Sequence, residues 1–437
     1  MEIVAIGGYG EIGRNSTAIK IGEDVFILDL GLHVPNYVKL TQVEEIEKLS
    51  EHKLIAENAI PNIEYIKDWR DKVKAIVIGH AHLDHIGAVP FLASKFKAPI
   101  LCTPFAALVL KSILSDLKKK FPNKIIPISP NSKVKIGSTE IEFISITHST
   151  PQTILILLKN LATNEKILYA NDFKLDVNPT LGRKASLEKI KSFSPDALII
   201  ECLYADDYRK MPSESIAAKM LEETLYAIKT QNLIILTTFA SHVARIKKII
   251  DIAFEIERKP IIIGRSFAKY LRAAEKTGLI SLRKVELIPY KEKAKKILRI
   301  VQSAKGKFLL IVSGHQGEPG SLLGELVDGK LPLKLESGDI VIFSSTIIPA
   351  ELNIQNRAAL EQKLSALGVR IFKDLHVSGH CAREDLRDFI LAAKPKNLFP
   401  THGDEDKIEA FKSLAAELNY ILGKNLFVLK NGDRKEI

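Results

Sequence analysis

Residues 74–85 read KAIVIGHAHLDH, an apolar run typical of a buried strand, followed at once by His80, His82, Asp84 and His85. In extended backbone, side chains two residues apart point the same way, so His80 and His82 can bind one metal ion. Asp84 and His85 begin a predicted helix, DHIGAVPFLASKF, whose first turn can aim them at a second ion. A lone histidine is more often a satisfied polar residue than a ligand. Three histidines with an aspartate in one hexapeptide favour a metal site.

Further ligands must come from elsewhere in the chain, because a catalytic zinc ion takes three protein groups and keeps a fourth position open. Three candidates follow apolar runs: His148 in IEFISITH, Asp172 in KILYAND and His402 in NLFPTHGD. Asp and His are also ordinary loop residues, so each one alone is weak evidence. The shared context after a strand, where active-site loops gather, indicates one common site.

The composition is that of a globular protein, with 46% hydrophobic and 26% charged residues in 437. Three cysteines far apart exclude a disulfide framework and favour a reducing cytoplasm. We expect no exported leader and no membrane span. The net charge of +11 suits a polyanionic partner, although lysine runs such as 118–120 and 291–296 are typical of solvated helix faces.

Strands and helices alternate along the whole chain, which predicts an α/β fold. From about Glu201 the alternation becomes longer and regular, as in a separate α/β unit, and histidines return after Pro349. No low-complexity linker separates these parts, so we expect the middle block to be inserted into the first fold. The predicted domains are 1–205, an inserted domain 206–348, and the remainder of the first domain, 349–437.

Gly8, Gly10 and Gly13 spell GxGxxG after a strand, with Asp29 at the distance of a ribose-binding acid. A dinucleotide fingerprint must open a helix, however, and the following residues alternate apolar and polar around a Gly-Glu-Asp turn. We therefore expect a hairpin and no small-molecule cofactor, with the glycines forming a tight turn near the site.

The motif His80-x-His82-x-Asp84-His85, with Asp29, His148 and Asp172, resembles the metallo-β-lactamase superfamily, which implies an αββα sandwich with a two-metal site. Glu201 in ECLYAD, His380 in HVSGHC and His402 in PTHG resemble the added motifs of its β-CASP branch. GGYGEIGRN, TTFASHVARI, SGHQGEPGS and HVSGHCARED most resemble the RNase J group in its archaeal form. The resemblance covers essentially the whole chain and implies an α/β β-CASP domain inserted in the sandwich.

The resemblance also implies a role for each residue of the site. One zinc ion would be held by His80, His82 and His148, the other by Asp84, His85 and His402, with Asp172 bridging them and Asp29 orienting ligands without binding metal. Asp84 and Asp172 would orient a hydroxide activated by the two metals, and His380, held by Glu201, would contact the scissile phosphate or protonate the leaving group. The residues expected to contact RNA are Ser378, His380, His376, Ser313 and His315.

Several alternatives stay open. His380 and His376 could be structural, and the turn that holds Ser313 and His315 could have no ligand role. Ala382 replaces a serine of the family pattern SGHAS, which leaves recognition of a 5′-phosphate less defined. Manganese could replace zinc, since histidine and carboxylate ligands accept several metals. Bacterial relatives carry a further C-terminal domain that this chain would lack, so a homodimer would have to use other surfaces.

The function expected from this pattern is a zinc-dependent ribonuclease of RNase J type. It would degrade 5′-monophosphorylated single-stranded RNA from 5′ to 3′, with endonuclease activity left open. A second candidate is a β-CASP endonuclease that processes RNA 3′ ends, related to the cleavage and polyadenylation factor. A small-molecule metallohydrolase is disfavoured by the inserted domain and the basic charge, and a non-catalytic RNA-binding subunit by the complete ligand set.

Overall fold

The computed structural model describes residues 1–43, 45, 49–118 and 121–437, so the expected helix face at 118–120 lies largely outside the described residues. The chain divides into two compact units. The first contains residues 1–177, 182–211 and 379–437, and the second contains 178–181 and 212–378. Within the described ranges, no helix is long and apolar enough to cross a membrane.

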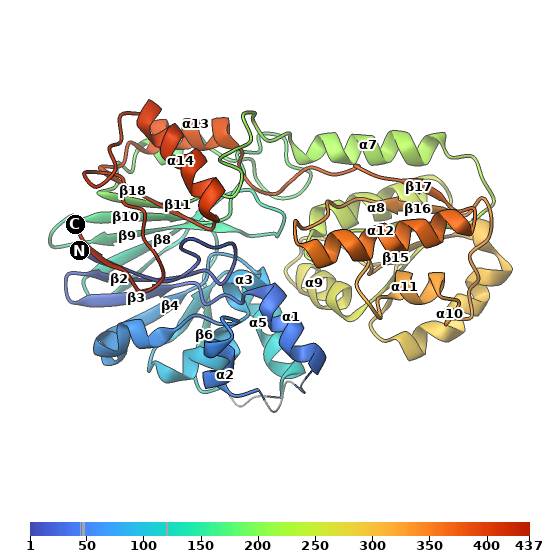
Figure 1. Ribbon diagram of the computed structural model, residues 1–437, viewed down its shortest axis with the longest axis horizontal. Coiled ribbons are helices and arrows are strands. Elements are labelled where there is room, and N and C mark those ends of the chain that lie inside the picture. Colours follow the sequence, from blue (N-terminus) through green and yellow to red (C-terminus); the bar gives the residue numbers. More distant parts are fainter. Residues whose placement is uncertain (44, 46–48, 119–120) are drawn as a thin grey trace. The chain divides into compact units, whose positions relative to one another are not determined.

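The first unit is built on two sheets (Figure 1). In spatial order, the first sheet is β19 (Arg434–Glu436), β1 (Glu2–Gly7), β2 (Ser16–Ile21), β3 (Asp24–Leu28), β4 (Val73–Val77), β5 (Ile100–Cys102) and β6 (Ile125–Pro127). The second is β18 (Asn397–Thr401), β11 (Ala197–Glu201), β10 (Lys166–Ala170), β9 (Ile154–Asn160), β8 (Thr139–Ser145) and β7 (Lys133–Ile136).

An apolar core lies between the two sheets and a second one lies outside the second sheet. Along β10, Ile167 and Tyr169 belong to the cluster between the sheets, whereas Leu168 and Ala170 belong to the outer cluster. Successive residues of a strand point to opposite faces, so this strand must be covered on both sides. The outer cover is α6 (Leu187–Lys191), α13 (Arg383–Ala393) and α14 (Glu405–Glu417).

Helices also lie beside the first sheet (Figure 1). They are α1 (Val34–Val43), α2 (Glu51–Ala56), η2 (Ile63–Lys72), α3 (Leu83–Ile86), α4 (Val89–Leu92), η3 (Ala93–Lys95) and α5 (Pro104–Asp116). The layers are therefore helix, sheet, sheet, helix, as expected of an αββα sandwich. The single helix expected from Asp84 onward is instead three short pieces. A side chain at Gly87 would meet the carbonyl oxygen of Leu83, and Pro90 is the second residue of the next helix.

The predicted hairpin after the glycines is confirmed, because β2 and β3 pair antiparallel with Ile21 opposite Asp24. The GxGxxG stretch therefore opens no helix, and the dinucleotide interpretation is excluded. Gly31 lies where this hairpin meets the metal-motif turn, and a Cβ there would lie 1.6 Å from the carbonyl oxygen of Asp84. Only glycine allows that approach.

The second unit is a six-stranded parallel sheet with helices on both faces (Figure 1). Its strands, in spatial order, are β14 (Glu286–Ile288), β13 (Lys259–Ile263), β15 (Phe308–Val312), β12 (Ile234–Thr237), β16 (Ile340–Phe343) and β17 (Arg370–Phe372). One core cluster joins the sheet to α10 (Lys291–Ser303), α11 (Leu322–Val327) and α12 (Glu351–Ala366). On the other side, α7 (Glu214–Ala227), α8 (Val243–Glu255) and α9 (Arg265–Lys276) contact one another in sequence.

The inserted block ends later than Ile348, the boundary expected from the sequence. The second unit continues to Ser378 because β17 pairs parallel with β16, with Arg370 beside Ile340. Leu360 and Leu364 of α12 are also part of its core. The return of histidines after Pro349 suggested an earlier boundary. The position of candidate site residues in the sequence, however, does not show in which hydrophobic core the neighbouring helices and strands pack.

Candidate metal centre

The predicted ligands converge at one edge of the first unit, and most of them lie in the loops that directly follow strands. His80 and His82 follow β4, and His82 precedes α3 as its N-cap. Asp172 follows β10. The ligand atoms form three overlapping groups, and within each group all atoms lie within 4.8 Å of one another. The groups are His80, His82, His148 and Asp172; Asp84, His85 and His402; and Asp172, His380 and His402.

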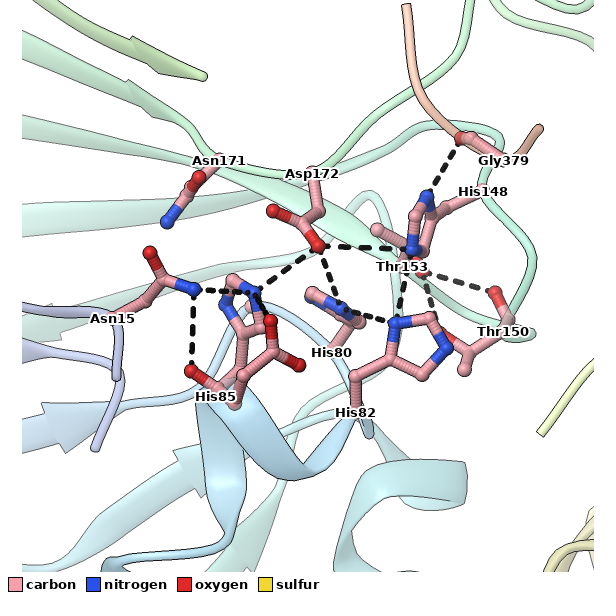
Figure 2. Close-up of polar contacts among 12 residues, drawn as sticks. Asn15, His80, His82, His85, His148, Thr150, Thr153, Asn171, Asp172 and Gly379 are labelled. Atoms are coloured by element: carbon pink, nitrogen blue, oxygen red, sulfur yellow. Dashed lines mark hydrogen bonds and ion pairs between the residues drawn. The ribbon is translucent and has the colours of Figure 1, made fainter. Parts of the chain in front are cut away.

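The first group is a compact set of ring nitrogens (Figure 2). Nδ1 of His82 lies 3.1 Å from Nε2 of His80 and 3.1 Å from Nε2 of His148. Oδ2 of Asp172 lies 3.5 Å from Nε2 of His80 and 3.8 Å from Nε2 of His148. Zinc–nitrogen bonds of about 2.0–2.1 Å in a tetrahedron place the ligand atoms about 3.3 Å apart. The spacing of these four atoms fits one such ion.

The second group lies beside the first and meets it at Asp172. Nε2 of His85 lies 3.6 Å from Oδ2 of Asp84 and 3.1 Å from Oδ2 of Asp172. Nε2 of His402 lies 4.0 Å from Oδ2 of Asp84 and 3.8 Å from Oδ1 of Asp172. One oxygen of Asp172 is thus close to nitrogens of both groups. A carboxylate in this position can bridge two cations.

The carboxylate of Asp172 is itself evidence that the residues fit a metal. The residue is 1% exposed, and its Oδ1 atom has no hydrogen-bond partner among the described residues. Leaving a buried carboxylate oxygen unsatisfied is costly, so such atoms are usually paired or coordinate a metal. Imidazole and carboxylate donors of this kind suit zinc and manganese. The donor set and the unpaired oxygen therefore both fit two divalent cations.

Burial keeps most of the rings at the site neutral. Burial, with the neighbouring His85, lowers the pKa of His80 well below its usual value, and burial lowers that of His82 to about 4. Burial also lowers the pKa of His148 well below its usual value. A neutral ring offers the lone pair that a metal requires. Burial opposes charge on His85 too, but the carboxylates of Asp172, Asp84 and Asp29 outweigh it and raise its pKa, so a cation there must displace a proton.

Comparisons with known proteins show to which family the chain belongs. The beta-lactamase superfamily domain matches residues 55–233, the ribonuclease J beta-CASP domain matches 231–360, and the Zn-dependent metallo-hydrolase RNA specificity domain matches 367–426. Ribonuclease J of Methanocaldococcus jannaschii is 39% identical over 99% of this chain and 98% of its own length. Ribonuclease J of Pyrococcus abyssi is 36% identical over 100% and 97%. The chain belongs to the ribonuclease J family.

More distant members of the ribonuclease J family extend further than this chain. Ribonuclease J2 of Bacillus subtilis is 29% identical, and the match covers 99% of this chain and 74% of that protein.

A crystal structure of a protein of unknown function from Enterococcus faecalis V583 matches with a TM-score of 0.64 at 18% identity, over 99% of both chains. At that identity the likeness supports the fold alone.

Three site residues of this family member have a strained backbone. Asp29, Asp172 and His402 have φ angles of 61°, 58° and 55°, in the left-handed region that residues with a Cβ rarely adopt. Each follows the end of a strand, at β3, β10 and β18. Strain of this kind clusters at functional sites, where surrounding contacts hold the backbone in place. Here it turns Asp172 and His402 toward each other and Asp29 toward the ring of His85.

Asp29 lies behind the ligands, and its carboxylate is fully used. Its Oδ2 atom lies 2.8 Å from Nδ1 of His85 and accepts a hydrogen bond from the hydroxyl of Tyr169 at 2.9 Å. Its Oδ1 atom accepts from the backbone nitrogen of Gly79 at 2.7 Å. A carboxylate on Nδ1 leaves Nε2 of His85 directed at the metal group. Tyr169 was not identified from the sequence, because a strand tyrosine is usually a core residue.

Asn15 is the other site residue that sequence reasoning missed. Its Nδ2 atom lies 3.0 Å from Nε2 of His85 and 2.9 Å from Nδ1 of His402, and Figure 2 shows it beside His85. Its Oδ1 atom lies 3.0 Å from Nδ1 of His402, and its backbone nitrogen donates to the carbonyl oxygen of Asp84. The signal in the sequence was its place at the end of GGYGEIGRN, a turn expected to lie near the site.

His380 and Glu201 form a second pair at the same edge. Nδ1 of His380 lies 2.6 Å from Oε2 of Glu201, and Nε2 lies 3.9 Å from Oδ2 of Asp172. Burial opposes charge on the ring, but Glu201 and Asp172 outweigh it and raise the pKa of His380 to about 9. The neighbouring carbonyl oxygen of Gly379 accepts from Nδ1 of His148 at 2.7 Å. The residues around His380 thus belong to the ligand network.

The remaining residues expected to contact RNA lie in the second unit. They are Ser313, His315, His376 and Ser378. Ser313 accepts a hydrogen bond from the backbone nitrogen of Leu322 at 3.3 Å. The ring of His315 lies 4.5 Å from that of Phe239, and His376 lies 6.0 Å from the same ring. Burial lowers the pKa values of His315 to about 4 and of His376 to about 3, so both are neutral near pH 7. Contact with RNA stays a prediction for all four.

Proposed function

We propose that this chain is a metal-dependent ribonuclease that degrades 5′-monophosphorylated, single-stranded RNA from 5′ to 3′. One observation carries the proposal: two sets of ligand atoms meet at Asp172, whose Oδ2 atom lies 3.1 Å from His85 and 3.5 Å from His80. Two adjacent cations are the arrangement used for phosphodiester hydrolysis. The relatives named ribonuclease J support RNA as the substrate class.

The first cation, which we propose to be zinc, would be held by His80, His82 and His148. The second would be held by Asp84, His85 and His402, with Asp172 shared; manganese is the alternative. When bound, two such ions supply Lewis acidity that activates water and stabilises negative charge on the phosphate oxygens. Asp29 and Asn15 hold ligand rings from behind, which fixes the ring orientations before substrate arrives.

His380 is placed to move a proton. Glu201 holds Nδ1, so Nε2 is the atom that faces the ligand groups, and the raised pKa keeps a proton there near pH 7. We infer that Nε2 donates this proton to the oxygen of the departing nucleotide, which would otherwise leave as a poor alkoxide. General acid catalysis of this kind contributes about 10²- to 10⁴-fold in rate.

The test uses one RNA sequence prepared with a 5′-monophosphate and with a 5′-triphosphate, labelled at the 3′ end. The metal-loaded protein is expected to shorten the monophosphate form stepwise from its 5′ end, releasing mononucleotides, and to act slowly on the triphosphate form. Excess chelator should stop both reactions, and His82→Ala should be inactive while remaining folded. Internal fragments of defined size would instead support an endonuclease that processes RNA ends. Cleavage that continues in chelator would contradict the proposal.

A further inference from the structure

Nearly all the net positive charge of the chain belongs to one segment of the second unit. Residues 265–307 contain 13 Lys or Arg and 3 Asp or Glu, a net charge of +10, whereas the whole chain carries +11. The other nine-tenths of the chain is therefore close to neutral. This segment comprises α9, β14 and α10, which follow one another at the β14 edge of the parallel sheet. We call residues 265–307 the basic segment.

On α9 the charges form one stripe. Its basic residues recur at intervals of four, three and four, which places them on one face of a helix. The opposite face is apolar and buried, with Phe267 and Leu271 in the core. Like charges three and four residues apart repel and destabilise a helix, so stability of the fold does not explain the pattern. The stripe consists of Arg265, Lys269, Arg272 and Lys276.

Most of the positive charge of the α9 stripe is not neutralised by acidic residues of the protein. Arg265, Arg272 and Lys276 are exposed and form no ion pair with any residue that the structure describes. On α10, by contrast, Lys295 pairs with Glu292 at 2.9 Å. The first turn of α9 contains no acidic residue, so Arg265 adds to the positive end of the helix dipole. These three side chains are therefore available to an external anion.

An exposed aromatic ring lies within the same segment. Tyr290 precedes α10 and is 55% exposed, and Nζ of Lys293 lies 5.9 Å from its ring centroid. The backbone nitrogen of Gly264, which follows β13, donates at 2.9 Å to the carbonyl oxygen of Ile288, the last residue of β14, so the strand ends that lead into α9 and α10 are adjacent. Basic side chains that interact with phosphates and an exposed ring on which a base can stack are the two elements of single-strand binding.

We propose that the basic segment is a second RNA-binding surface, which holds the phosphates of single-stranded RNA on the α9 stripe and stacks a base on Tyr290. The proposal rests on the proposed function in taking RNA as the substrate. None of its residues belongs to the metal groups, so hydrolysis and tethering can be tested separately.

The experiment measures binding of the metal-loaded protein to a fluorescent phosphorothioate RNA, which keeps the charge and slows hydrolysis, over a range of salt. The variant is Arg265→Gln/Arg272→Gln/Lys276→Gln. The control is Lys219→Gln/Lys229→Gln/Lys334→Gln, which removes the same charge from exposed positions elsewhere in the second unit. Losing three phosphate contacts should make the slope of log affinity against log salt shallower by about 2, at about 0.7 per contact. We expect affinity at least ~10-fold lower in the stripe variant and nearly unchanged in the control.

Tyr290→Ala should weaken binding without changing the salt slope, because stacking releases no counterions. Equal loss in the two triple variants, an unchanged affinity in Tyr290→Ala, or displacement of the RNA by polyglutamate as effectively as by unlabelled RNA would each overturn the proposal. If the wild type fails to hydrolyse unmodified RNA, the proposed function fails. If it hydrolyses RNA while the two triple variants bind alike, this inference alone fails.

Discussion

Asn15 connects the two histidines of the second ligand group through a single amide. When a metal occupies Nε2 of His402, the proton of that ring lies on Nδ1, and Oδ1 of Asn15 at 3.0 Å is placed to accept it. The convergence of the predicted ligands could be predicted from the sequence, because their types and spacing are typical of a metal site, whereas metal binding itself stays a prediction. Asn15 could not be predicted, since a buried hydrogen-bond partner has no spacing rule, and neither could the positive φ angles of Asp29, Asp172 and His402.

Asn15→Leu is therefore expected to weaken binding of one metal ion about 10- to 100-fold. Leucine keeps the backbone hydrogen bond to Asp84, but its side chain can neither accept the proton of Nδ1 nor replace Nδ2, which donates to the carbonyl oxygen of Asp84 at 3.2 Å. The readout is the number of metal ions per chain retained against a competing chelator, measured independently of activity. Asn15→Asp restores the acceptor and should recover part of the affinity. Unchanged metal content in Asn15→Leu would reduce the residue to a loop contact.

His380→Ala should leave the metal content unchanged and slow cleavage by about 10²- to 10⁴-fold. A general acid must be protonated, so the rate should fall as the pH rises through the pKa of His380, which bound cations would bring below the value of about 9 set by the carboxylates. Glu201→Gln removes the strongest of those carboxylates and should move the alkaline limb of the pH profile to lower pH. Wild-type turnover in His380→Ala would return the residue to a structural role.

In the second unit, a buried ion pair joins the helices α7 and α8 to each other, and its arginine also contacts the end of the sheet. Nε and Nη2 of Arg245, on α8, lie 2.5 and 2.6 Å from the two carboxylate oxygens of Glu214, on α7. Nη1 of Arg245 donates to the hydroxyl of Ser344 after β16 and to the carbonyl oxygen of Leu375. Burial opposes charge on Glu214, but His242 and Arg245 outweigh it and hold its pKa well below its ordinary value of 4.5.

Glu214→Gln should destabilise the second unit by about 3–5 kcal/mol, because Arg245 would keep a buried charge without its partner. The free energy of unfolding by denaturant measures this. A carboxylate whose pKa is depressed in the folded state stabilises the fold fully at pH values above its pKa in the unfolded state, about 4.5. The contribution of Glu214 should therefore be lost progressively as the pH falls below about 4.5. Glu223→Gln, on the exposed side of α7, should change stability by less than about 0.5 kcal/mol. Equal effects in the two variants would contradict the role of the pair.

Elements were predicted from the sequence more reliably than their limits. The alternation of β2 and β3 identified a hairpin because its period of two has no other explanation. The helix expected after Asp84 is divided at Gly87, where a side chain would meet the carbonyl oxygen of Leu83 and the side chain of Leu32, a tertiary contact that the apolar pattern does not reveal. The end of the inserted block was missed for a related reason. The helix α12 leads into β17, so the unit to which α12 belongs depends on the sheet that β17 joins. Because β17 pairs with β16, α12 packs in the core of the second unit.

Considered as a whole molecule, the chain is expected to be more stable with its metals than without them. A ligand that binds only the folded state stabilises it by RT ln(1 + [L]/Kd), about 2.7 kcal/mol when the metal is at 100 times its Kd. Chelation should thus lower the unfolding temperature of the first unit, which contains every predicted ligand, and leave that of the second unchanged. Domain-resolved calorimetry with and without chelator measures this. An unchanged transition of the first unit would contradict a site built from these ligands.

The cytoplasmic location and a homodimer stay predictions at the level of the whole molecule. The family could be identified from the sequence because its motifs extend from Gly7 to His402 in order. The lysine run 291–296 alone is typical of a solvated helix face, and only the count over residues 265–307 shows how much of the net charge of +11 this segment carries. Its place at one edge of a parallel sheet appears only once the strands are ordered.

The decisive measurement is a titration of zinc into metal-free protein, with hydrolysis of 5′-monophosphorylated RNA followed at each step. The shared carboxylate of Asp172 implies that the rate stays low until a second ion binds and reaches its plateau at two ions per chain, and that Asp172→Asn reaches no plateau. A full rate at one ion per chain, or full activity in Asp172→Asn, would show that no pair of cations performs the reaction.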